Sequence, residues 1–131
     1  MPGVDDGRQQ RRARGERLFR EICGAPPAAM QADFLDITIE HVFGEVWARD
    51  DVATRDQRLL TIAVLTTLGD ASALEIHVRM ALESGDLQES ELQGAVVHLA
   101  HYAGWPRGSM AFQVLAKVIA ERRAQSADGG R

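Results

Sequence analysis

The sequence predicts an all-α protein of about six helices, on three observations. Apolar residues recur at helical spacing along most of the chain, no run alternates convincingly enough for a strand, and glycine or proline ends several of the periodic segments. With 131 residues, 45% of them apolar, the chain is long enough for one core and too short for two ordinary domains. We therefore expect one domain over 12–124, with flexible tails at 1–11 and 125–131.

Proline and glycine delimit the first two helices. A helix is expected over 12–23, because Gly24 and the prolines of "GAPP" forbid its continuation. The arginines of 7–20 are expected on its solvated face. A second helix is expected over about 28–47, followed by the short loop "ARDDVAT".

The third helix is expected to be the centre of the core. Thr54 and Gln57 have the spacing of a capping box, so this helix should begin near Arg55. Its body, "LLTIAVLTTLG", is apolar on nearly every side, which is typical of a helix surrounded by other helices. Arg58 precedes this body, so its guanidinium should either reach water or be buried against an anion.

The fourth helix carries a histidine among apolar residues. Ser72 and Glu75 repeat the capping-box spacing and Gly85 suits a left-handed helix end, which together define a helix over 73–84. At 100° per residue His77 falls within the apolar arc. A lone histidine there is more often a hydrogen-bonded core residue than a catalyst, so both interpretations stay open. The arc consists of Leu74, Ile76, Val78, Met80, Ala81 and Leu82.

Gly104 separates the last two helices. A fifth helix is expected over 89–103, with His98 and Tyr102 together along one edge of its buried face and His101 pointing away. Pro106 is expected to open a sixth helix that ends near Ala124. The buried face of the fifth helix is predicted to hold Leu92, Ala95, Val96, Leu99 and Ala103.

Composition excludes several classes of function. The net charge is -4 and only the first twenty residues are locally basic, so no nucleic-acid partner is expected. No apolar run approaches the roughly 20 residues of a membrane span, and no apolar segment of a signal peptide begins the chain, so we expect a soluble, cytoplasmic protein. Cys23 is the only cysteine, which excludes a Cys-x-x-Cys pair within the chain.

No metal or cofactor motif accompanies the histidines. His98 and His101 are three residues apart and no His-Glu-x-x-His segment exists, so no metal site is expected. Gly-x-Gly-x-x-Gly, a phosphate-binding loop and a Gly-x-Ser-x-Gly turn are also missing, so no cofactor is expected. His41 and Glu45 are four residues apart and can meet, a pairing that is more often structural than catalytic.

Several blocks of the chain occur together in the order of a known family. The strongest are "GEVWARDDV" (44–52), "RLLTIAVLTTLGD" (58–70), "LEIHVRMALESG" (74–85) and "HLAHYAGWPRGSMAF" (98–112). Over about residues 12–122 the chain resembles the carboxymuconolactone decarboxylase family, and closely its 4-carboxymuconolactone decarboxylase branch. The resemblance implies the helical scaffold of alkyl hydroperoxidase D.

The hydroperoxidase chemistry of that scaffold is not expected here. The alkyl hydroperoxidase D branch uses a Cys-x-x-Cys pair before a histidine that matches His77, and its cysteine positions are Asp70 and Ala73 in this chain. A glutamate of that branch's proton relay falls at or near Arg58.

The resemblance implies a carboxy-lyase that converts 4-carboxymuconolactone to 3-oxoadipate enol-lactone without a cofactor, in aromatic catabolism through the protocatechuate branch of the β-ketoadipate pathway. The unsaturated lactone ring is itself the electron sink. One alternative is a decarboxylase or related enzyme acting on another lactone or β-keto acid in a biosynthetic pathway. Another is a non-catalytic or antioxidant-related helical protein on the same scaffold.

Such a reaction needs a cation for the spectator carboxylate, donors for the oxygen that gains charge, and an acid for the carbon. With the resemblance included, Arg58 and Arg49 are expected to recognise the carboxylate, and His77 is expected to protonate the dienolate. The other candidates donate to the lactone oxygen, shape the pocket or orient a histidine. The expected catalytic residues are His77, Arg58, Glu45 and His98, and the expected substrate-binding residues are Arg49, Tyr102 and Trp47.

The resemblance also implies a homo-oligomer, usually a trimer or hexamer, with a small anionic lactone as substrate. Independently, the apolar third helix and the exposed-looking Phe112, Leu115 and Ile119 suggest more apolar surface than one small domain hides.

Overall fold

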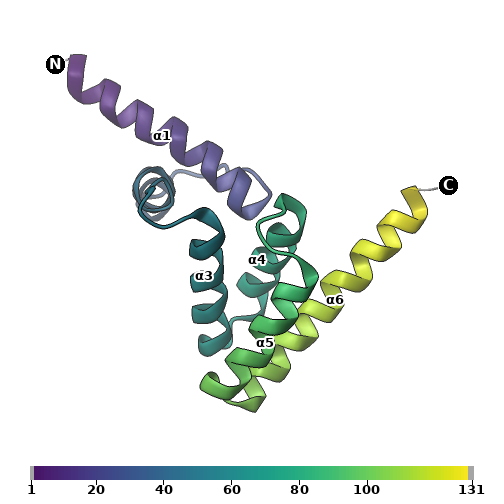
Figure 1. The fold of residues 1–131 in the computed structure, drawn as a ribbon. Coiled ribbons are helices and arrows are strands. Elements are labelled where there is room, and N and C mark those ends of the chain that lie inside the picture. The colour runs from purple at the N-terminus through teal and green to yellow at the C-terminus, as the bar shows by residue number, and fades with distance from the viewer. Residues whose placement is uncertain (1, 130–131) are drawn as a thin grey trace. The chain divides into compact units, whose positions relative to one another are not determined.

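The computed structural model describes residues 2–129, with side chains described from Gly7 onward. Six α-helices and one π-helical segment make up this range, and no strand occurs within it (Figure 1). The predicted all-α class is confirmed. The chain divides into two compact units, one up to Gln57 and one from Arg58 onward. Their boundary falls inside the stretch 12–124 that the sequence predicts as one domain.

The helices of the first unit differ from their predicted bounds. α1 covers Pro2–Cys23 and therefore begins well before residue 12. In place of one helix over 28–47 there are a short α2, Asp33–Ile37, and the π-helical η1, Thr38–Val46. The η1 ladder ends with the Trp47 N–H donating to the Val42 carbonyl at 2.9 Å, the i to i−5 pattern of a π-helix.

α1 and η1 approach closely because glycine stands on both. A Cβ at Gly15 would lie 1.8 Å from the Ile39 carbonyl oxygen, and one at Gly44 would lie 2.6 Å from the carbonyl oxygen of Arg11. Phe43 is buried beside this crossing and meets Phe19 edge to face, with ring centroids 4.9 Å apart. Larger residues at either glycine would force the two elements apart.

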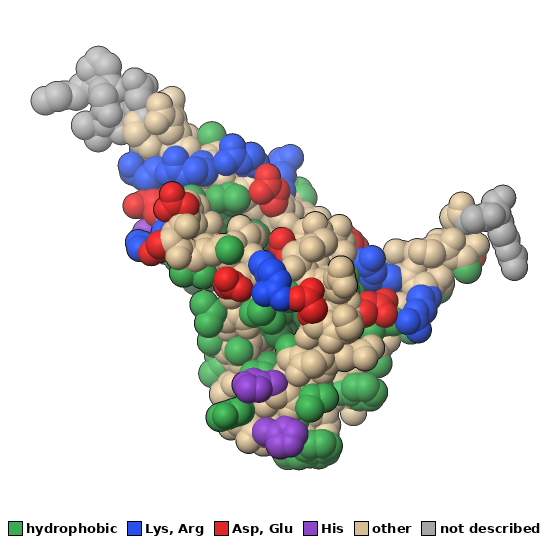
Figure 2. All heavy atoms as spheres, viewed as in Figure 1, with side chains coloured by type: hydrophobic (Ala, Val, Ile, Leu, Met, Phe, Trp, Pro, Cys, Tyr) green, Lys and Arg blue, Asp and Glu red, His purple; other side chains and the backbone are tan. Residues whose placement is uncertain are grey.

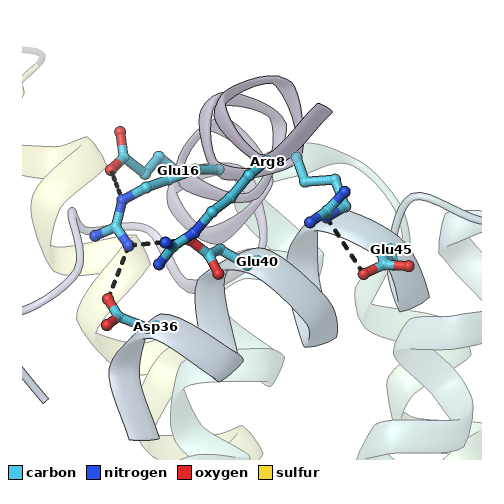
Figure 3. Close-up of polar contacts among 7 residues, drawn as sticks. Arg8, Glu16, Asp36, Glu40 and Glu45 are labelled. Carbon is cyan, nitrogen blue, oxygen red and sulfur yellow. Dashed lines mark hydrogen bonds and ion pairs between the residues drawn. The ribbon is translucent and has the colours of Figure 1, made fainter. Parts of the chain in front are cut away.

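Part of the predicted solvated face of α1 instead carries ion pairs to α2 and η1. Arg8 Nε lies 2.8 Å from Glu40 Oε1, and Arg12 Nη1 lies 2.8 Å from Asp36 Oδ1 (Figure 3). Arg12 also pairs with Glu16 on its own helix, at 3.2 Å. The expectation that these arginines face only solvent is therefore wrong. The acidic partners lie on later elements, out of reach of a pattern read along α1 alone.

The second unit contains most of the hydrophobic core. α4 (Ala71–Ser84) and α5 (Glu89–Ala103) both pack against α6 (Trp105–Gly129) (Figure 1). The fifth helix has the predicted bounds. The buried cluster consists of Ile62, Leu74, Val78, Ala81, Leu87, Leu92, Ala111, Val114, Leu115, Val118 and Ile119.

Helix α3 (Thr54–Leu68) is not the centre of this core, which corrects the prediction. Its buried residues are Arg58, Ile62 and Thr66. The opposite face exposes Leu60, Val64 and Leu68, at 62%, 56% and 68% (Figure 2). The apolar body of α3 is therefore two-sided, with one face in the core and one at the surface of this chain.

The capping box predicted for α3 does not form at its expected position. Ala53 accepts the first helical hydrogen bond, from the Gln57 N–H at 2.9 Å, so Thr54 lies inside the helix. The Gln57 side-chain amide donates to the Val46 carbonyl instead. The spacing is right, but the helix begins one residue earlier than it implies.

The N-cap of α4 is Asp70 and not Ser72. The Asp70 carboxylate accepts from the Ala73 N–H at 3.1 Å. Glu75, expected in a capping box, lies 2.6 Å from Lys117 on α6, and this partner lowers the pKa of Glu75. The other end agrees with the prediction, because Gly85 is left-handed, with φ of 80°.

The two chain ends are helical over most of the predicted tails. α1 includes residues 2–11, and α6 continues past Ala124 to Gly129. Residues 1, 130 and 131 of the predicted tails lie outside the described residues. Of the side chains expected to be exposed on the sixth helix, Phe112 is, whereas Leu115 and Ile119 are buried. Measured against the length and hydropathy of a membrane span, every helix in residues 2–129 falls short.

Candidate functional site

A buried arginine and a histidine meet at the centre of the candidate site. Arg58, in the first turns of α3, is fully buried, and its Nη1 lies 3.0 Å from Nδ1 of His77 on α4. A guanidinium can only donate, so His77 Nδ1 is the acceptor of this hydrogen bond. The neutral imidazole then carries its proton on Nε2.

The surroundings of His77 favour its neutral form. Burial, and secondly the positive charge of Arg58, lower the pKa of His77 from 6.5 to about 4. At neutral pH the imidazole is therefore uncharged, although it lies in a helix arc whose flanking residues Leu74, Val78 and Ala81 are buried.

Asp86 is a member of the site that the sequence analysis did not name. Its Oδ2 lies 3.4 Å from Arg58 Nη2, and its side chain is 21% exposed. Of the two alternatives for Arg58, burial against an anion is therefore confirmed. The available signal was the position of Asp86, directly after the Gly85 helix end on the element that carries His77. A buried arginine needs an anion, and this turn supplies one.

The Arg58 guanidinium is thus shared between a histidine and a carboxylate. Both terminal nitrogens have partners within the second unit, Nη1 at His77 and Nη2 at Asp86. Chemically, the arrangement places a neutral N–H acid next to a cation that can stabilise negative charge developing on the imidazole.

His98 and Tyr102 meet each other on α5, as predicted. Their ring centroids are 4.9 Å apart with planes inclined by 31°. Both side chains are exposed, Tyr102 to 82%, so they lie at the surface rather than along the margin of a buried face. His101 Nδ1 lies 2.6 Å from the Val97 carbonyl oxygen.

The remaining predicted residues belong to the first unit and have local partners. Glu45 Oε1 lies 3.6 Å from His41 Nδ1, so the predicted meeting of these two residues is confirmed. The same carboxylate is 3.6 Å from an α1 arginine (Figure 3). The Trp47 ring is stacked on Phe43 with centroids 6.1 Å apart. Arg49 donates from Nε to an oxygen of the Asp51 carboxylate at 3.0 Å.

Metal-ligand clusters were sought among all described residues. Within that part of the chain no three His, Cys, Asp or Glu side chains are grouped so that they could hold a metal ion. The site is therefore described by its organic groups.

Comparisons with known proteins agree with the resemblance seen in the sequence. The model of the carboxymuconolactone decarboxylase family matches residues 32–117. The chain is 32% identical over 87 residues to 4-carboxymuconolactone decarboxylase of Acinetobacter baylyi, covering 66% of this chain and 64% of that protein. It is 33% identical over 86 residues to nitrosuccinic acid decarboxylase of Metarhizium robertsii, covering 64% of this chain and 58% of that one.

The chain therefore spans about three fifths of the length of these curated relatives. The matched stretch 32–117 contains every residue that the sequence analysis assigned to the site, and it also contains Asp86.

Proposed function

The chain belongs to the carboxymuconolactone decarboxylase family, and we propose that it is a decarboxylase that acts without a cofactor. The observation that carries the proposal is the pair formed by buried Arg58 and His77 inside the stretch that matches the family. A cation held beside a neutral N–H acid in water-poor surroundings suits a reaction that creates an anion and then protonates it on carbon.

The proposed reaction is the conversion of 4-carboxymuconolactone to 3-oxoadipate enol-lactone. The bond between the ring and its carboxylate breaks and carbon dioxide leaves. The electron pair of that bond moves through the ring double bond onto the lactone oxygen, which gives a dienolate. One proton delivered to a ring carbon then completes the product, so no oxidant or reductant is consumed.

His77 is the proposed proton donor. Because its pKa of about 4 keeps the imidazole neutral at pH 7, the proton comes from Nε2 and not from an imidazolium. The negative charge left on the ring nitrogen pair is stabilised by Arg58, whose Nη1 already donates to Nδ1. Water returns the proton to Nε2 after product formation. A buried neutral histidine acting through its N–H has precedent in enzyme chemistry.

Arg49 is the proposed anchor for the spectator carboxylate. Both of the terminal nitrogens of Arg58 already have partners in the second unit, whereas Arg49 and its partner Asp51 have exposed side chains, at 62% and 54%. Replacing one exposed carboxylate by another costs little. We further propose His98, Tyr102 and Trp47 as donors to the lactone oxygen or as pocket residues, and Glu45 as a residue that orients a histidine.

A second candidate substrate is nitrosuccinate. The observation that favours it is the similarity to nitrosuccinic acid decarboxylase, which matches this chain about as well as the lactone decarboxylase does. A nitro group, like a conjugated lactone, can hold the electron pair that carbon dioxide leaves behind. The same acid on His77 would then protonate the carbon, so the residues serve either substrate.

The test is to incubate the purified chain with each substrate and follow carbon dioxide and product. We expect turnover of one of them, and a fall in kcat of about 100-fold or more for His77→Ala. The matched control is His101→Ala, an exposed histidine outside the site, which should leave kcat unchanged. Release of no carbon dioxide from either substrate would refute the proposal and favour a non-catalytic or antioxidant-related protein.

A further inference from the structure

We propose that Asp86 is a positioning residue: its carboxylate holds the Arg58 guanidinium so that Arg58 donates to His77 Nδ1 and the imidazole keeps its proton on Nε2. The catalytic consequence rests on the proposed function. The positioning itself rests on the geometry of three side chains in the second unit, and it can be tested without a substrate.

The guanidinium of Arg58 bridges the other two groups. Nη1 lies 3.0 Å from His77 Nδ1, and Nη2 lies 3.4 Å from Asp86 Oδ2. The guanidinium is planar and rigid, so contacts at two of its nitrogens fix its plane as well as its position. With the Asp86 contact removed, the group can turn about the end of its flexible stem and leave Nδ1.

Asp86 is itself held firmly by the turn that ends α4. Gly85 adopts the left-handed conformation, and the Asp86 N–H donates to the Ser84 hydroxyl oxygen at 3.3 Å. The next residue, Leu87, is buried in the core, and its N–H donates to the Ala81 carbonyl at 3.2 Å. The carboxylate therefore projects from a turn that is anchored on both sides.

α4 thus supplies two of the three groups. His77 lies in its body and Asp86 follows its last turn, so their spacing is fixed by one rigid helix and its end. Arg58 enters between them from α3. Because the Arg58 side chain is fully buried, its charge requires a compensating anion, and within the second unit Asp86 provides it.

The experiment measures the tautomer of His77 by the long-range proton–nitrogen correlations of its imidazole ring, in the full chain at pH 7. The wild type is expected to show the form with the proton on Nε2. Asp86→Asn keeps the shape but removes the charge, and it should give a mixture of both tautomers. Asp86→Glu keeps the charge and should retain the wild-type form.

The matched control is Glu83→Gln, which removes a negative charge from the exposed side of the same end of α4. It should leave the tautomer unchanged, which separates positioning by Asp86 from a general charge effect. A single Nε2 tautomer in folded Asp86→Asn overturns the proposal. If Asp86→Asn does not fold, a tautomer mixture in folded Asp86→Glu overturns it.

Turnover supplies a second measurement. Because Asp86 acts through Arg58 and does not touch the substrate, Asp86→Asn should lower kcat by about 10-fold to 100-fold while KM stays within about twofold. A changed KM with an unchanged kcat contradicts the positioning role. Absence of decarboxylation in the wild type would remove the proposed function, and the tautomer result would still decide whether Asp86 positions the pair.

Discussion

The residue that gives this chain its chemical character is His77, and its neighbours decide which proton it carries. Histidine in water titrates near neutrality, and an expectation of an acid at that position naturally suggests an imidazolium. The structure places a buried cation against Nδ1, which lowers the pKa of His77 to about 4. The acid available at neutral pH is therefore the Nε2–H of the uncharged ring.

The lowered pKa predicts a specific loss of stability in acid. Between pH 6.5 and about 4 the unfolded chain binds a proton at His77 that the folded chain does not. Stability from this group is therefore fully present above pH 6.5 and is lost as the pH falls towards 4, by roughly 2 kcal/mol after allowance for partial exposure. Urea unfolding of the wild type and His77→Gln at pH 7 and pH 4.5 measures it. Equal losses in both proteins would contradict the assigned pKa.

At the scale of single elements, helix ends are decided by which oxygen reaches the first free N–H groups. For α4 two neighbouring candidates exist, Asp70 and Ser72, and the Asp70 carboxylate makes the bond. Glu75, whose spacing to Ser72 suggested a box, is instead drawn to Lys117 on α6. A long-range ion pair thus removes one member of a local motif.

The cap assignment predicts unequal effects of two alanine substitutions. Asp70→Ala removes the acceptor for the Ala73 N–H and should lower the free energy of unfolding by about 1 kcal/mol. Ser72→Ala, at an exposed position inside the helix, should change it by less than about 0.5 kcal/mol. Denaturant unfolding of the two variants compares them directly. The reverse order would restore Ser72 as the cap.

Two helical glycines in the second unit predict opposite outcomes on substitution by alanine. A Cβ at Gly108 would lie 2.5 Å from the Ala100 Cβ and 2.8 Å from its Cα, so Gly108→Ala must push α5 and α6 apart. We expect a destabilisation of about 1–3 kcal/mol. Gly94 on α5 has no heavy atom within 4 Å of a Cβ, so Gly94→Ala should stabilise by about 0.5–1 kcal/mol. Thermal unfolding measures both, and destabilisation by Gly94→Ala would indicate that another chain contacts this position.

At the scale of the whole molecule, one chain leaves a notable amount of apolar surface uncovered. Leu60, Val64 and Leu68 form one stripe along α3, and Phe112 is exposed on α6 (Figure 2). Contiguous apolar surface of this kind marks interaction sites in soluble proteins. It agrees with the expectation of a homo-oligomer, a trimer or hexamer, which stays a prediction.

The expected assembly is measured by sedimentation equilibrium of the full chain. The wild type should have a mass several times the 14.4 kDa of one chain. Val64→Glu places a charge in the middle of the α3 stripe and should shift the population towards the monomer, because an unpaired charge is costly to bury. Gln125→Glu, an exposed site on α6, is the control and should keep the wild-type mass. A monomeric wild type contradicts the prediction.

Features set by nearby residues could be predicted from the sequence alone. The bounds of the fifth helix, the left-handed Gly85 and the meeting of His98 with Tyr102 all follow from spacing along one helix. The family blocks likewise identified His77 and Arg58 and the correct fold class. Each of these depends on interactions within a turn or two of helix, or on several motifs in the right order.

Only the tertiary structure decided what each of these groups contacts. The partner of Arg58 is Asp86 and that of Glu75 is Lys117, and both pairs join separate elements. The exposed face of α3 and the pKa of His77 depend in the same way on packing and burial. Helical periodicity ranks faces by polarity, but it carries no information about which face of another element lies opposite. Charge compensation and burial are properties of that opposition, so they arise only when the helices pack.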